Sequence, residues 1–549
     1  MSSSATVFNI SGKALHADGQ LWRWASRLLA ISVLIPLLVI VASWFFIDPE
    51  VWSHLSSTVL PELIGNTLLL VFGVGIGTIV LGVSLAWLTS LCDFPGRRIL
   101  DWALMLPFAL PAYVLAFVFL GVFDFAGPVQ SALREWFDLS PRWSLEIRNA
   151  FGVIVVMTLV LYPYVYMLAR VSFMGQGQSS YEAARSLGRG PWSAFFHVSL
   201  PMARPGIIAG LSLALMEALA DFGAVSVFNF NTFTTAIYKA WFGFFDLHSA
   251  AQLASILLTL VLVALVVERR FRERARYADN GHAGVQRRMR LRGTQAWLAS
   301  IYGWFIFTLA FALPVGQLLS WAWGSREHLD GRYFDLLSHT SSLGAMAALL
   351  TVSGAFIMAF AHRYYGDSFT RIGVRVGTLG YALPGSVLAV GVMLSLTWVD
   401  NRLADGLEWL TGSDPGLFLS GTVVALLMAY FARFLAVAYG PVDSALERVK
   451  PSIREAARSL GASQVQIMRR VYVPMLRPGL LTAGLLVLVD VMKEMPATLL
   501  LRPFGWDTLA VRIYELTSEG EWERAALPAI ALVAVGLLPV ILLVRKSAR

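Results

Sequence analysis

Apolar residues occur along this chain in long runs that short polar segments separate. Six runs precede residue 268 and six follow residue 295. The runs are Leu21–Phe46, Leu63–Leu91, Leu100–Phe123, Ala150–Val171, Pro205–Val227, Ala250–Val267, Ala296–Trp323, Ser342–Ala361, Val374–Trp398, Gly416–Ala438, Pro478–Leu500 and Ala525–Val544. An α-helix needs about 20 such residues to cross a bilayer. The pattern predicts an all-α polytopic membrane protein with about twelve transmembrane helices.

The two sets of runs are related by an internal repeat. The heptapeptide EAARSLG occurs at 182–188 and again at 455–461, which is 273 positions later. The same offset relates ALPAYVLA (109–116) to ALPGSVLA (382–389), and PMARPG (201–206) to PMLRPG (474–479). An even number of spans separates the copies, so the sequence predicts two six-helix repeats in parallel orientation.

We therefore expect four segments along the chain. The predicted segments are an N-terminal tail (1–20), a first six-helix unit (21–267), a basic linker (268–295) and a second six-helix unit (296–549).

The net charge of +8 is distributed unevenly between the segments that join the runs. The segment that begins ERRFRERAR at residue 268 holds nine arginines by residue 293, whereas residues 400–416 lean acidic. Counting spans puts the arginine-rich segments on the same side as both termini, and basic loops of membrane proteins face the cytoplasm. We expect both termini and both EAARSLG segments in the cytoplasm of a multi-pass protein. Nucleic-acid binding by the arginine-rich linker is the weaker interpretation.

Each EAARSLG copy has the local signals of a short capped helix followed by a second one. Serine three residues before the glutamate predicts a capping box, glycine at the end predicts a left-handed C-terminal cap, and a later proline predicts the end of the second helix. These residues are Ser179, Glu182, Gly188 and Pro201 in the first copy and Ser452, Glu455, Gly461 and Pro474 in the second. A single such loop is readily explained as a capped segment on the headgroups, but two identical charged copies favour a contact outside the chain.

The spacing E-A-A-x3-G-x9-aliphatic-x-aliphatic-P resembles the cytoplasmic signature of permease subunits of binding-protein-dependent ABC importers. The resemblance implies the type I importer permease fold, in which each such helix docks on a separate ATPase subunit. The coupling residues that it implies are Glu182, Ala183, Ala184, Gly188, Glu455, Ala456, Ala457 and Gly461. It also implies two ATPase subunits and an extracytoplasmic substrate-binding protein as partners, in a bacterial cytoplasmic (inner) membrane.

Motifs of the common hydrolytic sites are absent from the sequence. It contains no G-x-x-x-x-G-K-[ST], H-E-x-x-H or G-x-S-x-G, and Cys92 is its single cysteine. We therefore expect no catalytic residues and no cofactor in this chain, with ATP and Mg²⁺ bound by the partner ATPase. Gly73 and Gly77 share a helical face, which favours close helix packing over a ligand loop.

Acidic residues interrupt the fifth apolar run of each half at equivalent positions. Glu217 and Asp221 correspond at the 273-residue offset to Asp490 and Glu494, with Lys493 beside the second pair. The i,i+4 spacing places each pair on one helical face. One interpretation is a translocation path whose hard oxygen donors meet a highly charged cation. The other is that these acids pair with Lys493 or cap unwound helix ends, so we assign no metal site firmly.

The cargo is less constrained than the transport class. Residues 221–243 and 492–531 resemble ferric-iron permeases, which implies ferric iron as substrate. Importers of thiamine, polyamines, sulfate or phosphonate share the architecture or the motif and stay open. A secondary transporter driven by ions is the remoter alternative, because such a carrier has no need for two capped cytoplasmic helices.

Overall fold

A computed structural model describes residues 4–140, 142–175, 186–188, 190–275, 288–413 and 416–547. Its regular structure there is helical apart from two short strands, β1 (Cys92–Asp93) and β2 (Met289–Arg290), which pair in parallel. Within this part of the chain, eleven helices are long and apolar enough to cross a membrane, or up to twelve when one bent pair counts as a span. The predicted all-α polytopic class is confirmed.

Two compact units divide the chain. Unit 1 contains Met1–Ile47, Ala250–Ser255 and Phe334–Thr508, and unit 2 contains Asp48–Ser249, Ile256–Tyr333 and Leu509–Arg549. Each unit therefore combines segments from both predicted sequence halves: unit 1 includes the start of the first half, and unit 2 includes the start and the end of the second half. These contact units describe packing, and the repeat boundaries at 21–267 and 296–549 stay a prediction.

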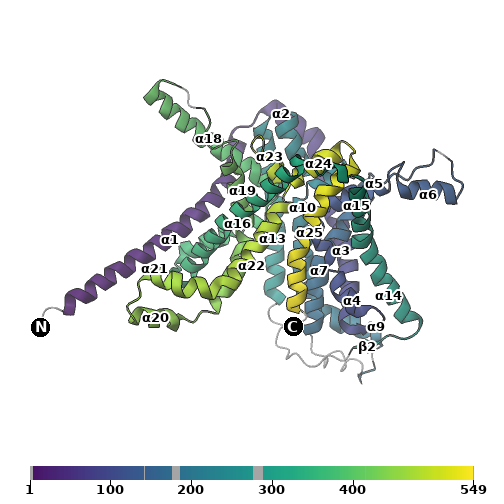
Figure 1. Cartoon of the computed structure of the whole chain (residues 1–549), viewed down its shortest axis with the longest axis horizontal. Coiled ribbons are helices and arrows are strands. Elements are labelled where there is room, and N and C mark those ends of the chain that lie inside the picture. Colours follow the sequence, from purple (N-terminus) through teal and green to yellow (C-terminus); the bar gives the residue numbers. More distant parts are fainter. Residues whose placement is uncertain are drawn as a thin grey trace. The chain divides into compact units, whose positions relative to one another are not determined.

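Unit 1 combines the N-terminal helix of the chain with the helices between Phe334 and Thr508 (Figure 1). Its helices are α1 (Ser4–Ala42), η1 (Ser43–Phe45), α16 (Gly331–Tyr365, from Phe334 on), α17 (Ser368–Gly377), η9 (Gly380–Ala382), α18 (Gly385–Thr411), α19 (Val423–Glu447), α20 (Pro451–Ser459), α21 (Gln464–Ile467), η10 (Met468–Tyr472), α22 (Val473–Lys493) and α23 (Pro496–Leu501). In this unit α1 packs on α17 and α18, and α19 packs on α22.

Unit 2 holds the remaining helices and both strands. Its helices are α2 (Pro49–His54), η2 (Leu55–Val59), α3 (Leu60–Leu91), α4 (Arg97–Ala103), η3 (Leu106–Ala109), α5 (Ala112–Val122), α6 (Pro128–Trp136), α7 (Ala150–Gly175), α9 (Pro191–Ala194), η4 (Phe195–Ser199), α10 (Leu200–Ala220), α11 (Gly223–Val227), α12 (Phe233–Tyr238), η5 (Lys239–Gly243), α13 (Leu247–Ala275, outside Ala250–Ser255), α14 (Thr294–Phe307), η7 (Thr308–Ala312), α15 (Leu313–Gly324), η8 (Arg326–His328), α24 (Leu509–Ser518) and α25 (Trp522–Ser547). Helix α3 packs on α7, and α7 packs on α10.

The third apolar run of each half is broken where the sequence suggested one continuous span. In the first half the chain turns by 95° between η3 and α5, where Pro111 adopts an extended conformation. Pro384 occupies the equivalent position before α18. Proline lacks a backbone donor and keeps the preceding residue out of the helical region, so the repeated ALP segment ends one helix and begins the next.

Four proline residues follow π-helical turns that absorb the lost hydrogen bond. In η4 the Leu200 N–H donates to the Phe195 carbonyl, five residues back, and Pro201 comes next. Pro474 follows η10 in the same way, as Pro61 follows η2 and Pro314 follows η7. The prediction that Pro201 and Pro474 end a helix is therefore wrong, because the widened turn carries the helix past the proline.

Small residues let α3 and α7 approach closely. A Cβ atom added at Gly73 would overlap Ile154, and one at Gly77 would overlap Thr158, both on α7. A side chain at Gly82 would likewise meet Val165. The predicted packing role of the Gly73-x-x-x-Gly77 pair is confirmed, and it follows the small-residue rule for helix contacts in membranes.

Polar contacts hold α1 against the loop before α17. Arg27 Nη2 donates to Asp367 Oδ2 at 2.6 Å, and Arg23 Nε donates to the Tyr365 carbonyl at 2.9 Å. Asp367 is also the N-cap of α17, where its Oδ1 accepts from the Thr370 N–H at 2.7 Å. Hydrogen bonding from Thr370, followed by the Arg27 guanidinium, lowers the pKa of Asp367 to about 2.

Replacing Asp367 by asparagine keeps a capping oxygen but removes the charge paired with Arg27, which should lower the stability of unit 1 at neutral pH by at most about 1 kcal/mol, as for exposed ion pairs. Because its folded pKa lies below the unfolded value of about 3.9, the carboxylate stabilises the protein above pH 4. This contribution is lost as the pH falls from about 4 toward 2. Thermal unfolding of the purified protein at pH 7 and pH 3 measures both effects. Asp335→Asn, at an exposed acid, should change neither midpoint, and equal effects of both variants would contradict the assignment.

Candidate functional site

The second EAARSLG copy forms α20, which begins one residue before the predicted cap. Its N-cap is Lys450, whose side chain makes no capping hydrogen bond, and Pro451 stands in the first turn. The capping box predicted at Ser452 is therefore wrong. Proline is favoured at the first helical position because its fixed φ suits the helix and its missing N–H needs no partner there. In the first copy, Ser179 lies outside the described residues.

The C-terminal end of α20 is closed by Gly461. The Gly461 N–H donates to the Arg458 carbonyl at 2.9 Å and the Ala462 N–H donates to the Ala457 carbonyl at 3.1 Å. This pair of bonds is a Schellman motif, and it requires the left-handed φ of +77° that Gly461 adopts. Gly188 has a φ of +81° at the equivalent place. The predicted left-handed glycines are confirmed in both copies.

The predicted coupling residues of the second copy present a small exposed surface. Glu455 and Ala456 are exposed and Ala457 is half-buried. Leu460 follows with 87% exposure, and its counterpart Leu187 is 84% exposed. The sequence analysis missed these leucines, although their identity in two charged heptapeptides was a usable signal. In the first copy, the predicted residues Glu182, Ala183 and Ala184 lie outside the described residues.

Arg454, the residue before Glu455, attaches α20 to the end of α16. Its Nη2 donates to Tyr365 Oη at 2.6 Å, and its guanidinium carbon lies 5.0 Å from the Tyr364 ring centroid and 5.3 Å from that of Tyr365. Tyr181 stands at the equivalent position of the first copy, so the repeat gave no sign of this contact.

An aromatic cluster continues this attachment into unit 1. The ring centroids of Tyr364 and Tyr472 are 5.8 Å apart, those of Tyr472 and Phe360 are 5.3 Å apart, and those of Phe360 and Trp22 are 4.6 Å apart. These rings belong to α16, η10 and α1. Edge-to-face and tilted aromatic pairs at such distances add to burial energy. Arg454 therefore connects α20 to three membrane-spanning segments of the same unit.

Asp221 and Glu494 lie where the fifth span of each half breaks. Asp221 follows α10 and its Oδ1 accepts from the Val225 N–H of α11 at 3.1 Å. Glu494 follows α22, and its two carboxylate oxygens accept from the Ala497 and Thr498 N–H groups of α23, each at 3.0 Å. Both acids thus cap the short helix after the break, an arrangement that the sequence analysis had weighed against a role in the path.

Glu494 is also part of a buried polar network in unit 1. Thr498 Oγ1 donates to Glu494 Oε2 at 2.9 Å and lies 2.6 Å from Tyr430 Oη. Arg433 Nη1 lies 4.0 Å from Glu494 Oε1 and donates to the Leu383 carbonyl at 3.3 Å. A Cβ atom at Gly385 would overlap both charged groups, so the glycine provides the space that they occupy. The sequence analysis missed Arg433, because Val160 stands at its equivalent position.

The other two acids lie one turn before these breaks. Glu217 on α10 and Asp490 on α22 are each half-buried, and Lys493 follows Asp490 on α22. Among the described residues, no group of three or more His, Cys, Asp or Glu side chains is arranged to hold a metal ion. The structure thus separates each predicted acidic pair into one capping acid and one half-buried helical acid.

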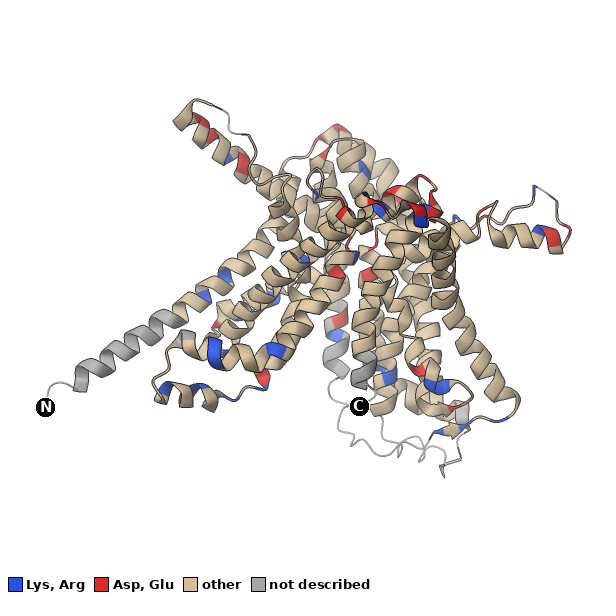
Figure 2. Ribbon diagram, in the orientation of Figure 1, with Lys and Arg blue, Asp and Glu red and all other residues tan. Residues whose placement is uncertain are grey.

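Charged side chains gather at opposite ends of unit 1 (Figure 2). The α20–α21 end carries Lys450, Arg469 and Arg470, all exposed, while the far end of α18 carries the exposed Asp405 and Glu408. Basic side chains of membrane proteins concentrate on the cytoplasmic side. This distribution favours a cytoplasmic location for α20.

Comparison with known proteins locates the repeat independently. The family model described as binding-protein-dependent transport system inner membrane component matches residues 78–277 and 351–549. The two matched segments begin 273 positions apart, which is the offset between the EAARSLG copies. The predicted pair of related halves is thereby confirmed.

Curated relatives cover the chain to different extents. An Fe(3+)-transport system permease protein of Haemophilus influenzae is 30% identical over 489 residues, which is 88% of this chain and 89% of that protein. A molybdenum transport system permease protein of Escherichia coli is 31% identical over 192 residues, 34% of this chain and 82% of that protein. A putative 2-aminoethylphosphonate transport system permease protein of Salmonella typhimurium is 30% identical over 221 residues, 40% of this chain and 77% of that protein.

Proposed function

Because the chain belongs to the family of binding-protein-dependent transport system inner membrane components, we propose that it is the permease subunit of an ATP-driven importer of ferric iron. Its class is that of the ABC transport permeases, multi-pass proteins of the membrane. The observation that carries the choice of ferric iron is the match to a ferric-iron permease across both halves of the chain, 88% of its length. The molybdenum and phosphonate permeases match 34% and 40% of it.

The mechanism that we propose is alternating access driven by two separate ATPase subunits. The α20 surface around Glu455, and its counterpart around Glu182, dock on these subunits in the cytoplasm. Closure of the ATPase pair on ATP moves the two docked helices, and the spans reopen outward to receive iron from a binding protein. The exposed Leu460 and the basic end of unit 1 support this orientation.

Thiamine, polyamine, sulfate and phosphonate importers keep the same architecture with a different cargo. Reconstitution of the chain with its ATPase and binding protein in proteoliposomes separates them. Ferric iron loaded on the binding protein should stimulate ATP hydrolysis, whereas thiamine, spermidine, sulfate and 2-aminoethylphosphonate should not. Stimulation by one of these alternatives in place of iron would assign that cargo.

An ion-driven carrier is distinguished by its energy source. Uptake by cells should stop when ATP is depleted and continue when an uncoupler dissipates the proton gradient. The opposite result would favour the secondary-transporter interpretation.

Glu217 and Asp490 are the acids that we propose for the path, because both are half-buried on a span one turn before the break, whereas Asp221 and Glu494 cap the helix after it. Replacing both by their amides, Glu217→Gln with Asp490→Asn, should reduce iron uptake and iron-stimulated ATP hydrolysis about tenfold or more. Carboxylates are hard anionic donors suited to a hard, highly charged cation, and amides remove that charge. Uptake of radioactive iron into proteoliposomes measures the loss.

The matched control replaces two exposed acids of α18, Asp405→Asn with Glu408→Gln, and removes the same charge. It should leave uptake unchanged. Full uptake and ATP hydrolysis in the Glu217→Gln, Asp490→Asn protein would show that these acids are not part of the path.

A further inference from the structure

We propose that an apolar groove on α14 and the arginines beside it bind one anionic phospholipid molecule, with an acyl chain in the groove and the phosphate at the guanidinium groups. The site belongs to unit 2 and contains none of the four acids discussed above. The occupant is a diacyl phospholipid with a net negative headgroup, of which phosphatidylglycerol is the probe used below.

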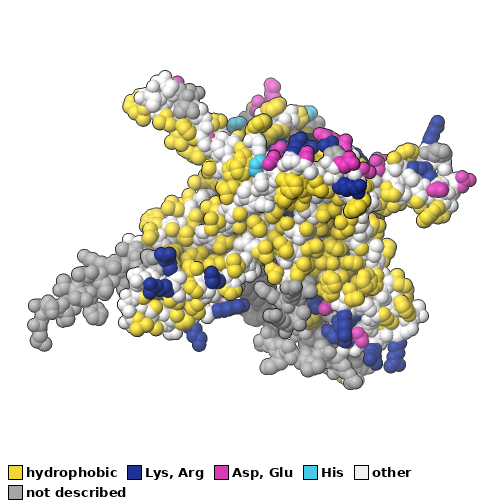
Figure 3. All heavy atoms as spheres, in the orientation of Figure 1, with side chains coloured by type: hydrophobic (Ala, Val, Ile, Leu, Met, Phe, Trp, Pro, Cys, Tyr) yellow, Lys and Arg dark blue, Asp and Glu magenta, His cyan; other side chains and the backbone are white. Residues whose placement is uncertain are grey.

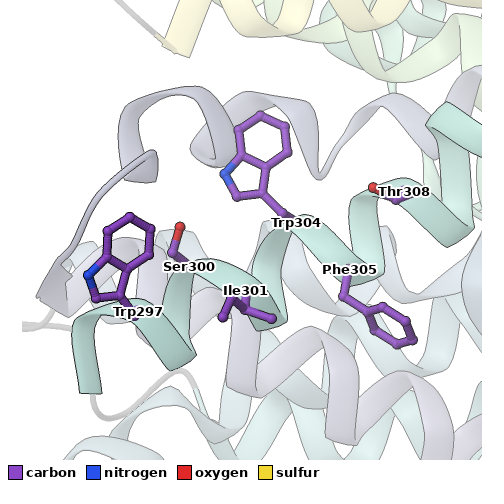
Figure 4. A pocket seen from close by; sticks show the side chains of 6 residues that line it. All are labelled: Trp297, Ser300, Ile301, Trp304, Phe305 and Thr308. Carbon is purple, nitrogen blue, oxygen red and sulfur yellow. The ribbon is translucent and has the colours of Figure 1, made fainter. Parts of the chain in front are cut away.

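The groove runs along one stretch of α14 and the start of η7 (Figure 4). It has a volume of about 480 Å³ and is lined by Trp297, Ser300, Ile301, Trp304, Phe305 and Thr308. Trp297, Ile301 and Phe305 are 63%, 60% and 57% exposed. Trp297 and Trp304 project toward the same side of the helix in Figure 4. The lining is thus mainly hydrophobic and open to the surroundings, which suits a hydrocarbon chain.

Helix α14, which carries the groove, packs closely on α4. A Cβ atom at Gly303 would overlap Leu100 of α4. Gly96, with a φ of +79°, brings its backbone against Trp304, and Ser300 lies at its other side. A larger residue at either glycine would push α14 and α4 apart, so these contacts hold Trp304 and Ser300 of the groove against α4.

Three exposed arginines come just before α14 in sequence or begin α4, the helix that α14 packs on. Arg290 belongs to β2, where it pairs in register with Asp93 of β1, and Arg292 comes just before α14 begins at Thr294. Arg98 lies in the first turn of α4, two residues after the Gly96 contact with Trp304. All three side chains belong to exposed residues.

The neighbouring Arg97 makes its polar contacts within the protein, so it is not one of the arginines that we propose for the phosphate. It is buried, donates to the Thr89 carbonyl at 3.0 Å and lies 3.6 Å from Asp93. The carboxylate of Asp93 is therefore already paired with Arg97. On the face drawn in Figure 3, Lys and Arg side chains gather at this end of unit 2, next to hydrophobic surface.

The combination of arginines and an apolar groove indicates which ligand binds there. Three guanidinium groups next to an apolar groove match a ligand that carries a phosphate at one end and hydrocarbon at the other, and each basic residue near a membrane surface favours anionic lipid. Tryptophans are enriched at the level of lipid headgroups, which agrees with Trp297 in the first turns of α14, close in sequence to Arg292. A free phosphate ion uses only the arginines, and a neutral hydrocarbon uses only the groove.

The test uses the purified full chain, delipidated in detergent and titrated with phosphatidylglycerol under native mass spectrometry. The Arg98→Gln, Arg290→Gln, Arg292→Gln protein should bind it about tenfold or more weakly than the unaltered chain. The matched control, Arg371→Gln, Arg469→Gln, Arg470→Gln, removes the same charge from exposed residues of unit 1 and should bind normally. Equal affinities of the two triple variants, or no weakening in the first, would overturn the site.

A second variant tests the groove without touching the arginines. Ile301→Gln places a polar group in the apolar wall at an exposed position, where it should not disturb folding. It should weaken phosphatidylglycerol binding several-fold and leave binding of glycerol phosphate unchanged. Phosphatidylcholine should bind the unaltered chain much more weakly than phosphatidylglycerol. Glycerol phosphate binding as tightly as the whole lipid, or unchanged lipid binding by Ile301→Gln, would show that the groove holds no acyl chain.

Discussion

Replacing Arg454 by alanine is expected to uncouple transport from ATP hydrolysis, with uptake falling at least about tenfold while the ATPase subunits continue to turn over. Arg454 is the polar attachment of α20 to Tyr365 and Tyr364 at the end of α16. In the mechanism proposed above, α20 would then move with its ATPase subunit while the spans stay in place. The expected phenotype therefore differs from that of a variant that fails to dock, which would lose both activities.

The size of the effect follows from the three contacts that are lost. A hydrogen bond to a charged group contributes about 1.5–3 kcal/mol, and each cation–π contact contributes about 0.5–1 kcal/mol at exposed sites. Lysine at this position keeps the charge but lacks the planar fork that contacts a hydroxyl and two rings together. Arg454→Lys should therefore give an intermediate loss of uptake.

Uptake and ATP hydrolysis measured on the same proteoliposomes give the coupling ratio directly. The matched control is Arg402→Ala on α18, where an exposed arginine lies 5.7 Å from the ring centroid of Trp398. That variant should keep the ratio of the unaltered protein. A normal ratio in Arg454→Ala would mean that α20 transmits its movement through other contacts.

Local signals in the sequence predicted the backbone conformation at the end of both EAARSLG segments. Gly188 and Gly461 adopt left-handed conformations because a C-terminal cap of this kind requires them. The start of α20 was predicted one residue too late. Pro451 occupies the first helical position, so Ser452 lies inside the helix and is not its N-cap. Arg454 could not be found at all, since its partner Tyr365 lies 89 positions away in sequence and the equivalent positions of the first half hold Tyr181 and Cys92.

Runs of apolar residues predicted where spans occur, but not where they break or pack. The breaks at Asp221 and Glu494 depend on backbone hydrogen bonds that the side chains accept after the turn. The hydropathy pattern shows only that a carboxylate interrupts the apolar run, and it does not show which hydrogen bonds that carboxylate accepts. The membership of α1 in unit 1 likewise depends on long-range contacts, such as that between Arg27 and Asp367, which are 340 positions apart.

Glu494→Ala is expected to destabilise unit 1 by about 3 kcal/mol or more, because the buried carboxylate is the acceptor of several hydrogen bonds and the neighbour of an arginine. The variant leaves the half-buried Arg433 without a carboxylate, and it leaves the Ala497 and Thr498 N–H groups at the start of α23 without their acceptor. Glu494→Gln keeps one acceptor oxygen and should lose less, about 1–3 kcal/mol. Thermal unfolding midpoints in a single detergent rank the variants.

Arg433→Met in the Glu494→Gln background should recover part of the loss, because the double variant no longer buries an unpaired charge. The matched comparison is Glu515→Gln, whose partner Arg512 lies closer, at 3.2 Å, but in a more exposed pair. Its loss should be at most about 1 kcal/mol, as for surface pairs. Burial rather than the separation of the charges therefore sets the ranking. A larger loss at Glu515 than at Glu494, or a double variant less stable than Glu494→Gln alone, would contradict this account of the break.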